Sequence, residues 1–262
     1  MLASVAVTHD FDSPAFVDSY DELPLWSAMF GSVLLERVPL DANTIALDVG
    51  CGTGFPLLEL AQRLGPGSFV HGLDPWVTAV VRAERKRRQS RVTNAALRIG
   101  DAAAMPFRDH SFDLVVSNLG LNNFADAHAA VVECRRVLRR GGVLALTTNL
   151  VGHMREFYEV FESVLPADKR SALHAHIEHR ATVDSLRKLL DGAGFFVRAE
   201  IEDTFTMRYA NGAALLSHDF IRFGFLPAWR DVAGEEEVFA EVAVRLPSPL
   251  TLTIPRAYVE AV

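Results

Sequence analysis

The chain has 262 residues, half of them hydrophobic and 23% of them charged. This length and composition supply one large globular core and exclude a mostly disordered chain. The formal net charge of -7 gives no overall attraction to nucleic-acid phosphates, so nucleic acid is not an expected partner. One basic run ends an expected helix, where cations complement the helix dipole, and it predicts a solvated face. That run comprises Arg82, Arg85, Lys86, Arg87, Arg88 and Arg91.

The two cysteines, Cys51 and Cys134, offer neither a disulfide framework nor a metal-binding spacing, which favours a reducing compartment. The sequence does not begin with a basic and then apolar leader. No apolar run reaches the ~18 residues that a membrane-spanning helix requires. We therefore expect a cytoplasmic protein that has no membrane partner.

Strand and helix patterns alternate along the first part of the chain. Short apolar or β-branched runs predict strands at 44–49, 68–73, 95–99, 113–117 and 143–148. Apolar residues at helical spacing predict helices at 55–64, 75–88 and 125–139, the last ended by the glycines at 141 and 142. This alternation predicts a parallel, doubly wound sheet.

The rhythm changes after residue 150. Helices are expected at about 154–165 and 183–190, a sixth strand at 195–206, a mostly helical segment at 209–244, and a final strand at 250–254 on the edge of the sheet. The predicted fold is Rossmann-like α/β, with a mostly parallel seven-stranded sheet and a helical insertion before the last strand. One domain spans the whole chain. We divide it into an N-terminal helical lid (1–40), a cofactor-binding core (41–150) and substrate-side helices with the final strands (151–262).

The first strand ends in a glycine-rich turn that reads Asp48-Val-Gly50-Cys-Gly52-Thr-Gly54. Its glycines permit positive φ and let a ligand lie against the backbone. The next helix begins there, and its free N–H groups attract an anion. A dinucleotide loop would need glycine at position 55, where the chain has Phe55. The carboxylate of Asp48 suits a ligand that carries ammonium and sulfonium groups better than a pyrophosphate, so an NAD-dependent oxidoreductase is the weaker interpretation.

Two further carboxylates follow the next two strands. Asp74 stands where open α/β sheets place a carboxylate that binds ribose hydroxyls. Asp101 stands where a carboxylate can accept a hydrogen bond from an adenine amino group, and Trp76 would form one wall around that ring. For each carboxylate the alternative is a helix N-cap, since both precede possible helix starts.

These residues resemble the class I S-adenosylmethionine-dependent methyltransferases, especially the branch with quinone-ring methylases and the malonyl-carrier-protein methylase of biotin synthesis. The segment from Ala46 to Gly54 is similar to the first motif of that family. The other matching segments, in the family's order, are 72–74, 100–102 with 105–107, 112–117 and 136–142. The resemblance is specific from about residue 40 to 150 and fades beyond, in the part that would determine the substrate.

The resemblance implies S-adenosylmethionine as the cofactor. The turn would hold its methionine end, Asp74 its ribose, and Asp101 with Ala102 its adenine, while Asn118 and Leu119 would border the methyl group. Tyr20, on an N-terminal helix, would close over the cofactor, although simple helix packing is the alternative. The complete expected cofactor site is Tyr20, Asp48, Gly50, Cys51, Gly52, Gly54, Asp74, Pro75, Trp76, Asp101, Ala102, Asn118 and Leu119.

The sequence assigns no catalytic residue. Methyl transfer from a sulfonium needs mainly alignment and exclusion of water. Many relatives carry histidine after the fourth strand, whereas this chain reads LGLNNF from residue 119 to 124. The candidate bases are His153, His218 and Tyr20, against the alternative of surface or packing roles. No metal is expected, because the histidines at 174, 176 and 179 would not share one helix face.

The expected acceptor is a small molecule, either hydrophobic or bearing a carboxylate. Rings in the helical insertion would roof its pocket, although core packing also explains them: Phe220, Phe223, Phe225 and Trp229. Arginines there would bind a carboxylate unless they face solvent: Arg208, Arg222 and Arg230. A monomer or homodimer is expected. The alternative function is a non-catalytic binding or interaction module that keeps the cofactor fold.

Overall fold

The computed structural model describes residues 14–22 and 24–262. Its strands are β1 (Ile45–Val49), β2 (Phe69–Asp74), β3 (Ala95–Ile99), β4 (Phe112–Asn118), β5 (Leu138–Asn149), β6 (Val197–Tyr209) and β7 (Leu250–Ala261). The helices of the first half are α1 (Pro14–Glu22), α2 (Leu25–Leu35), α3 (Leu57–Leu64), α4 (Val77–Gln89), the short η1 (Gly120–Asn123) and α5 (Ala127–Val137). Those of the second half are α6 (Arg155–Val164), η2 (Ala167–Lys169), α7 (Arg170–Glu178), α8 (Val183–Gly192), α9 (Gly212–Ser217), α10 (Asp219–Gly224), α11 (Leu226–Ala233) and α12 (Glu237–Arg245).

One seven-stranded sheet has the order β3-β2-β1-β4-β5-β7-β6. The pairs among β1 to β5 are parallel, whereas β7 pairs antiparallel with both β5 and β6. The predicted fold class is therefore confirmed. The placement of the last strand at the sheet edge was wrong, because β7 inserts between β5 and β6 and leaves β6 at the edge.

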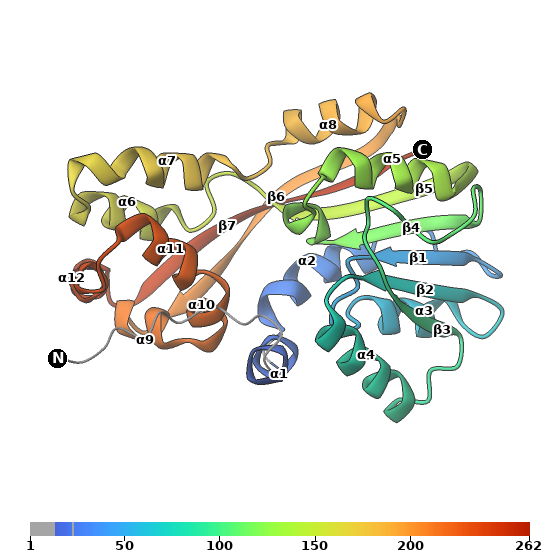
Figure 1. The fold of residues 1–262 in the computed structure, drawn as a ribbon, viewed down its shortest axis with the longest axis horizontal. Helices are drawn as coiled ribbons and strands as arrows, with labels where there is room; N and C mark the ends of the chain where they lie inside the picture. The colour runs from blue at the N-terminus through green and yellow to red at the C-terminus, as the bar shows by residue number, and fades with distance from the viewer. Residues whose placement is uncertain (1–13, 23) are drawn as a thin grey trace.

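Helices cover both faces of the sheet, with α2, α3 and α4 on one face and α5 and α8 on the other (Figure 1). Successive side chains of β1 point to opposite faces of the sheet, so the strand packs against both layers of helices. Ala46 packs in the cluster with α2 and α3, whereas Leu47 and Val49 pack in the cluster with α5 and α8. The order in which strands join the sheet reverses between β1 and β4, which opens a crevice at the carboxyl ends of these parallel strands.

The ribbon of β6 and β7 extends beyond the rest of the sheet, and α6 and α9 to α12 gather around its far end (Figure 1). This helical part has its own aromatic core. Trp229 is fully buried and stacks on Phe157, with ring centroids 4.0 Å apart. Its indole N–H donates to the hydroxyl of Tyr158 at 3.1 Å. Trp26 and Phe30 of α2 belong to the same cluster, so the helical part is continuous with the sheet domain.

The boundary between α5 and β5 differs from the expected one. The helix ends at Val137 and the strand begins at Leu138, so Gly141 and Gly142 lie inside β5. The glycines therefore do not end the helix, as the sequence had suggested. Leu138 already pairs with Phe112 of β4, and the register shifts before the next pair. Tertiary pairing at this point overrides the local helix pattern.

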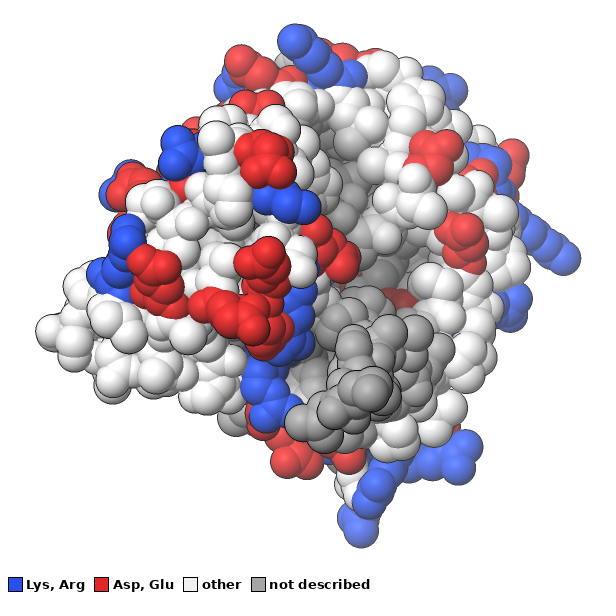
Figure 2. All heavy atoms as spheres, turned by 60° about the vertical axis from the view of Figure 1, so that its left-hand side comes forward, with Lys and Arg blue, Asp and Glu red and all other residues white. Residues whose placement is uncertain are grey.

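Ion pairs join α1 to α4. Arg82 contacts Asp18 at 3.1 Å, Asp21 at 2.8 Å and Glu22 at 3.2 Å, and Lys86 also contacts Asp21. The basic run thus lies partly against the N-terminal helix, where the sequence predicted only a solvated face. On the face drawn in Figure 2, cationic and anionic side chains lie next to one another and form no extended patch of one sign.

Both cysteines are buried and free. Among residues 14–22 and 24–262, no helix combines the length and the apolar character that crossing a bilayer would require.

Trp229→Ala is expected to lower the free energy of unfolding by about 3–5 kcal/mol, because it empties a buried ring site and removes the partner of Tyr158. Denaturant titration measures this. Phe196→Ala is the control, since that ring is 71% exposed and its loss should cost about 0.5 kcal/mol or less. Equal losses in the two variants would contradict the assignment of the aromatic core.

Candidate cofactor and acceptor site

A cavity of about 520 Å³ lies at the carboxyl ends of the parallel strands. The glycine turn, the end of β2, the loop after β4 and the end of β5 all contribute to its wall, together with α1, α2 and α10. The expected cofactor residues that line it are Tyr20, Gly50, Gly52, Asp74, Pro75, Trp76, Asn118 and Leu119. A smaller chamber of about 190 Å³ adjoins the same turn and adds Cys51 to the lining.

The turn after β1 is held open by its glycines. Gly50, Gly52 and Gly54 have φ of 79°, 47° and 97°, a region that residues with a Cβ rarely adopt. A Cβ at Gly52 would meet nothing within 4 Å, so that side of the turn faces free space. The backbone N–H of Gly52 donates to Asp74 Oδ2 at 2.8 Å. A ligand in the cavity therefore lies against bare backbone.

Asp48 lies beneath this turn and is fully buried. Among the described residues, neither of its carboxylate oxygens has a hydrogen-bond partner of normal geometry, although the backbone N–H of Leu57 is near enough to oppose the rise in its pKa. Burial and, secondly, the charge of Asp74 raise the pKa of Asp48 to about 8. Burial therefore keeps Asp48 largely protonated at neutral pH, and a bound cation would favour its ionised form. The electrostatics of the turn therefore favour a positively charged ligand.

Asp74 connects β2 to the turn. Its Oδ1 accepts from the backbone N–H of Trp76 at 2.8 Å, and its Oδ2 accepts from Gly52. Burial raises the pKa of Asp74, and these two hydrogen bonds oppose that rise. Each carboxylate oxygen has a second lone pair, so Asp74 can still accept a hydroxyl from a ligand. Its position at the cavity wall fits the predicted ribose contact.

Four predicted residues lie outside the cavity lining, namely Asp48 beneath the turn and Gly54, Asp101 and Ala102. Asp101 is exposed, and its carboxylate accepts from the backbone N–H of Ala103 at 2.9 Å within a turn; no helix lies in the described segment between β3 and β4, so the helix N-cap alternative is wrong for Asp101. Ala102 is buried in the sheet core beside α5. Gly54 packs against Leu58, and a Cβ there would come within 3.4 Å of that side chain. The structure therefore brings together the turn, Asp74 and the loop after β4, but not the adenine pair.

The loop after β4 is fixed by its own hydrogen bonds. Asn118 donates its amide to the carbonyl of Ser27 at 3.1 Å and accepts from the hydroxyl of Thr147 at 2.7 Å. Leu119 has φ of 65°, an uncommon conformation for a residue with a side chain. Its N–H donates to the carbonyl of Thr147 at 2.9 Å. These contacts hold the loop at the cavity wall in one conformation.

Aromatic side chains from α1 form one side of the cavity. The ring of Tyr20 meets that of Trp76 edge-on at 5.6 Å, and Phe16 lies 5.5 Å from Trp76. Burial, followed by the charges of Asp74 and Asp21, raises the pKa of Tyr20 to about 12. Tyr20 therefore keeps its proton at neutral pH and can donate a hydrogen bond.

Sequence reasoning missed the polar residues at the opposite end of the cavity. Asn122, Asn149 and Arg180 line it there. The amide of Asn122 donates to the side-chain oxygen of Asn149. Arg180 was not among the site residues predicted from the sequence. No local pattern marked it, because it reaches the cavity through contacts that are distant in sequence.

The candidate histidine bases lie away from the cavity lining. His153 is fully buried, and neither ring nitrogen has a partner. Burial, and then the charges of Arg180 and His176, lower its pKa to about 3, which makes it a weak base. His218 packs edge-on against Tyr209 at 5.7 Å. Both roles stay predictions.

The histidine cluster near α7 points to three different partners. His174 contacts Glu162 at 2.8 Å, His176 contacts the hydroxyl of Tyr158 at 3.2 Å, and the ring of His179 contacts the carbonyl of His176. In the described ranges, no set of three His, Cys, Asp or Glu side chains is arranged to hold a metal ion.

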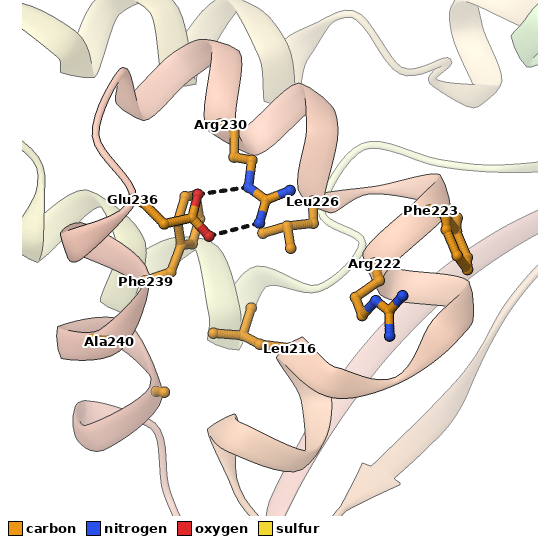
Figure 3. Close-up of a pocket in the computed structure, with 9 residues that line it drawn as sticks. Leu216, Arg222, Phe223, Leu226, Arg230, Glu236, Phe239 and Ala240 are labelled. Carbon is orange, nitrogen blue, oxygen red and sulfur yellow. Dashed lines mark hydrogen bonds and ion pairs between the residues drawn. The ribbon is translucent and has the colours of Figure 1, made fainter. Parts of the chain in front are cut away.

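A second pocket of about 500 Å³ lies within the helical part (Figure 3). Arg230 and Glu236 point toward each other there and form two hydrogen bonds of 2.7 and 2.6 Å. Arg222 lies over the ring of Phe223 and pairs with Asp219 at 3.3 Å. Neither arginine lines the larger cavity. Arg208 is exposed on β6. The alternative of solvent-facing arginines therefore describes this part of the chain.

A family model described as a methyltransferase domain matches residues 40–194. The chain is 30% identical over 190 residues to a demethylmenaquinone methyltransferase of Lactiplantibacillus plantarum, covering 69% of this chain and 79% of that protein. It is 33% identical over 136 residues to a demethylmenaquinone methyltransferase of Geobacillus sp. (strain WCH70), covering 50% of this chain and 58% of that protein. Several of the curated relatives are thus matched over little more than half of their length.

A SAM-dependent methyltransferase from Aquifex aeolicus shares the fold, with a TM-score of 0.57 and 18% identity over 72% of this chain and 92% of that one. The order of the strands in the sheet, the glycine turn and the family match all indicate the same class of protein. The chain belongs to the methyltransferase domain family, in the class I S-adenosylmethionine-dependent branch.

Asp48→Asn is expected to flatten the dependence of stability on pH. The unfolded carboxyl loses its proton near pH ~4, whereas the folded one keeps it to about 8. Between these values the folded state binds more protons, so the free energy of unfolding of the wild type falls as pH rises. Denaturant titrations at several pH values between 4 and 8 measure this fall.

Asp184→Asn is the control, because that side chain is 80% exposed on α8. Its stability should follow the wild-type pH dependence. A slope in Asp48→Asn equal to that of the control would show that Asp48 does not carry the raised pKa.

Proposed function

We propose that the chain transfers the methyl group of S-adenosylmethionine to a small-molecule acceptor. The observation that carries this proposal is the side-chain-free turn at Gly52, which lies above the buried, unpartnered carboxylate of Asp48. A cationic nucleoside with an amino-acid end matches both features. A dinucleotide does not, because Phe55 occupies the place of the third glycine and the carboxylate would repel a pyrophosphate.

In this proposal the turn and Asp48 hold the ammonium end of the cofactor, and Asp74 holds its ribose hydroxyls. Trp76 and Pro75 pack beside the nucleoside, and Asp101 with Ala102 receives the adenine at the outer end. Asn118 and Leu119 border the methyl group. The positions of the turn, Asp74, Trp76 and the loop after β4 in the cavity lining support these contacts, whereas Asp48 would act from beneath the turn. The exposure of Asp101 leaves its carboxylate accessible at the outer end.

Tyr20 and the rest of α1 form a cover over the site in this proposal. Tyr20 lines both the cavity and the smaller chamber. The ion pairs of α1 with Arg82 and Lys86 hold this helix against α4. Trp76, directly before α4, also lines the cavity and would pack against the nucleoside. Closure by α1 would exclude water, which methyl transfer requires.

The bound cofactor supplies an electrophilic methyl group on a sulfonium, and in-line displacement leaves a neutral thioether. The task of the chain is then to align the acceptor and to keep the site dry. Leu119 and Phe225 contribute apolar surface to the cavity wall. Tyr20 donates a hydrogen bond rather than accepting a proton, as its raised pKa requires. The titratable side chains in the described lining are Tyr20, Asp74 and Arg180, so an acceptor already ionised at neutral pH suits the site best.

The acceptor end of the cavity has aromatic walls. They come from α2, α10 and the loops before α5 and α11, through Trp26, Phe124, Phe220 and Phe225. Of the four rings predicted to roof the acceptor pocket, we keep Phe220 and Phe225 in the proposed site. Trp229 belongs to the buried core and Phe223 lines the second pocket. Apolar walls with a few polar groups are typical of small-molecule sites. We therefore propose a hydrophobic acceptor.

Asp74→Ala is expected to weaken the binding of S-adenosylhomocysteine by about 1.5–3 kcal/mol, the range of a hydrogen bond to a charged group. Isothermal calorimetry measures this change. Asp184→Ala, on the exposed surface of α8, should leave the affinity unchanged. If a folded Asp74→Ala variant binds S-adenosylhomocysteine with wild-type affinity, Asp74 does not contact the cofactor.

Methyl transfer itself is tested with labelled S-adenosylmethionine and a panel of hydrophobic acceptors. Appearance of label in an extracted acceptor is the expected result. Binding of the cofactor without transfer to any acceptor would favour the non-catalytic module. Failure of the wild-type chain to bind S-adenosylhomocysteine would overturn the proposed function.

A further inference from the structure

Arg180 is brought to the cavity by a contact between distant segments. It follows α7, and the next residue, Ala181, forms a parallel bridge with Leu150 directly after β5. The N–H of Val151 donates to the carbonyl of Ala181 at 3.0 Å. This bridge fixes Arg180 beside Asn149, the last residue of β5. Both side chains line the same end of the cavity.

The guanidinium of Arg180 has no anionic partner among the described residues. Its Nε is buried without a hydrogen-bond partner, and no carboxylate forms an ion pair with it. Burial lowers the pKa of Arg180. The titratable groups around it are the hydroxyl of Tyr158 and the imidazoles of His153, His176 and His179. None of these groups is an anion at neutral pH.

Arg180 is half-buried, and a guanidinium that lacks a counter-ion and whose Nε is shielded from water is costly to the folded protein. A ligand that brings a negative charge would relieve that cost. The neighbouring side chains of Asn122 and Asn149 are neutral amides, and in the part of the chain that the structure describes the amide of Asn149 is not used as a donor. This end of the cavity is therefore rich in donors, whereas the end beneath the glycine turn holds the carboxylate of Asp74.

We propose that the acceptor is an apolar carboxylic acid whose carboxylate binds Arg180, with Asn149 beside it, while its hydrocarbon body lies among Phe220, Phe225 and Trp26. This inference rests on the proposed function and names the acceptor class for the same site. A guanidinium matches a planar carboxylate through two parallel hydrogen bonds. One cation with neutral neighbours balances one negative charge, which favours a carboxylate over a dianionic phosphate.

The position of Arg180 favours the acceptor over the cofactor as the source of the carboxylate. The glycine turn follows β1, whereas Arg180 lies beside the end of β5, and β4 separates these two strands in the sheet. Two strand spacings amount to roughly 10 Å. The ring of Phe225 in the cavity wall lies 6.2 Å from that of His153, whose pKa is lowered by burial and then by the charge of Arg180, so an aromatic wall lies near Arg180.

Calorimetry on the full chain saturated with S-adenosylhomocysteine tests the proposal. The probes are 3-phenylpropionate and 2-naphthoate, with their neutral amides and phenyl phosphate for comparison. The variants are Arg180→Gln and Arg180→Lys, with Arg170→Gln as the matched control, because Arg170 is exposed at the start of α7. Thermal unfolding confirms that each variant folds; removal of an unpaired half-buried cation should not lower the melting temperature.

The expected result is that at least one carboxylate binds and its amide binds at least about 10-fold more weakly. Arg180→Gln should weaken the binding of that carboxylate by roughly 10- to 150-fold, the range for charged hydrogen bonds. Arg180→Lys should lose less, and Arg170→Gln should behave as the wild type. The affinity for S-adenosylhomocysteine alone should be the same in all four proteins.

Three outcomes would overturn the proposal. If acids and amides bind equally, or if neither binds, the acceptor is not a carboxylic acid. Tighter binding of phenyl phosphate would assign the site to a phosphate. Loss of S-adenosylhomocysteine affinity in Arg180→Gln would assign Arg180 to the cofactor. Each of these results leaves the proposed function standing, since that depends on cofactor binding by the wild-type chain.

Discussion

The hydrogen bond between the N–H of Gly52 and the carboxylate of Asp74 is the contact on which the site depends. It ties the end of β2 to the turn after β1, and the same carboxylate accepts from Trp76 at the start of the next helix. Three segments are thereby fixed around one buried side chain. The turn remains open on its free side because Gly52 has no Cβ. A rigid backbone surface next to negative charge is what a cationic nucleoside requires.

The cavity has opposite polarity at its two ends. Asp48 and Asp74 lie at the glycine turn, and Arg180 lies at the end of β5, with aromatic walls between them. Asp48 is fully buried and Arg180 is half-buried, and in the described ranges neither is paired with a group of opposite charge. The fold thus retains an acidic group and a basic group whose charges are not compensated by the described residues. Such groups lower stability in the absence of ligands and give the site directionality when ligands bind.

Local sequence patterns predicted the elements that bind the cofactor. The strands β1 to β4, the glycine turn and the position of Asp74 were all evident, because each depends on short apolar runs and on glycines at fixed spacing. Contacts between distant segments were not evident. Arg180 depends on the bridge between Leu150 and Ala181, and the order of β6 and β7 depends on pairing across a long helical insertion. Burial of His153 and the ion pairs of α1 with Arg82 likewise have no local signal.

The ribbon of β6 and β7 also determines how the acceptor side is attached. Tyr209 pairs with Leu250, so the two ends of the intervening helical segment leave the sheet as neighbours. The entropy of closing a segment whose ends already meet changes only slowly with its length. Helices α9 to α12 can therefore change in length at little cost in closure entropy. The acceptor wall contributed by α10 can thus vary, while Arg180 is held separately by the bridge between Ala181 and Leu150.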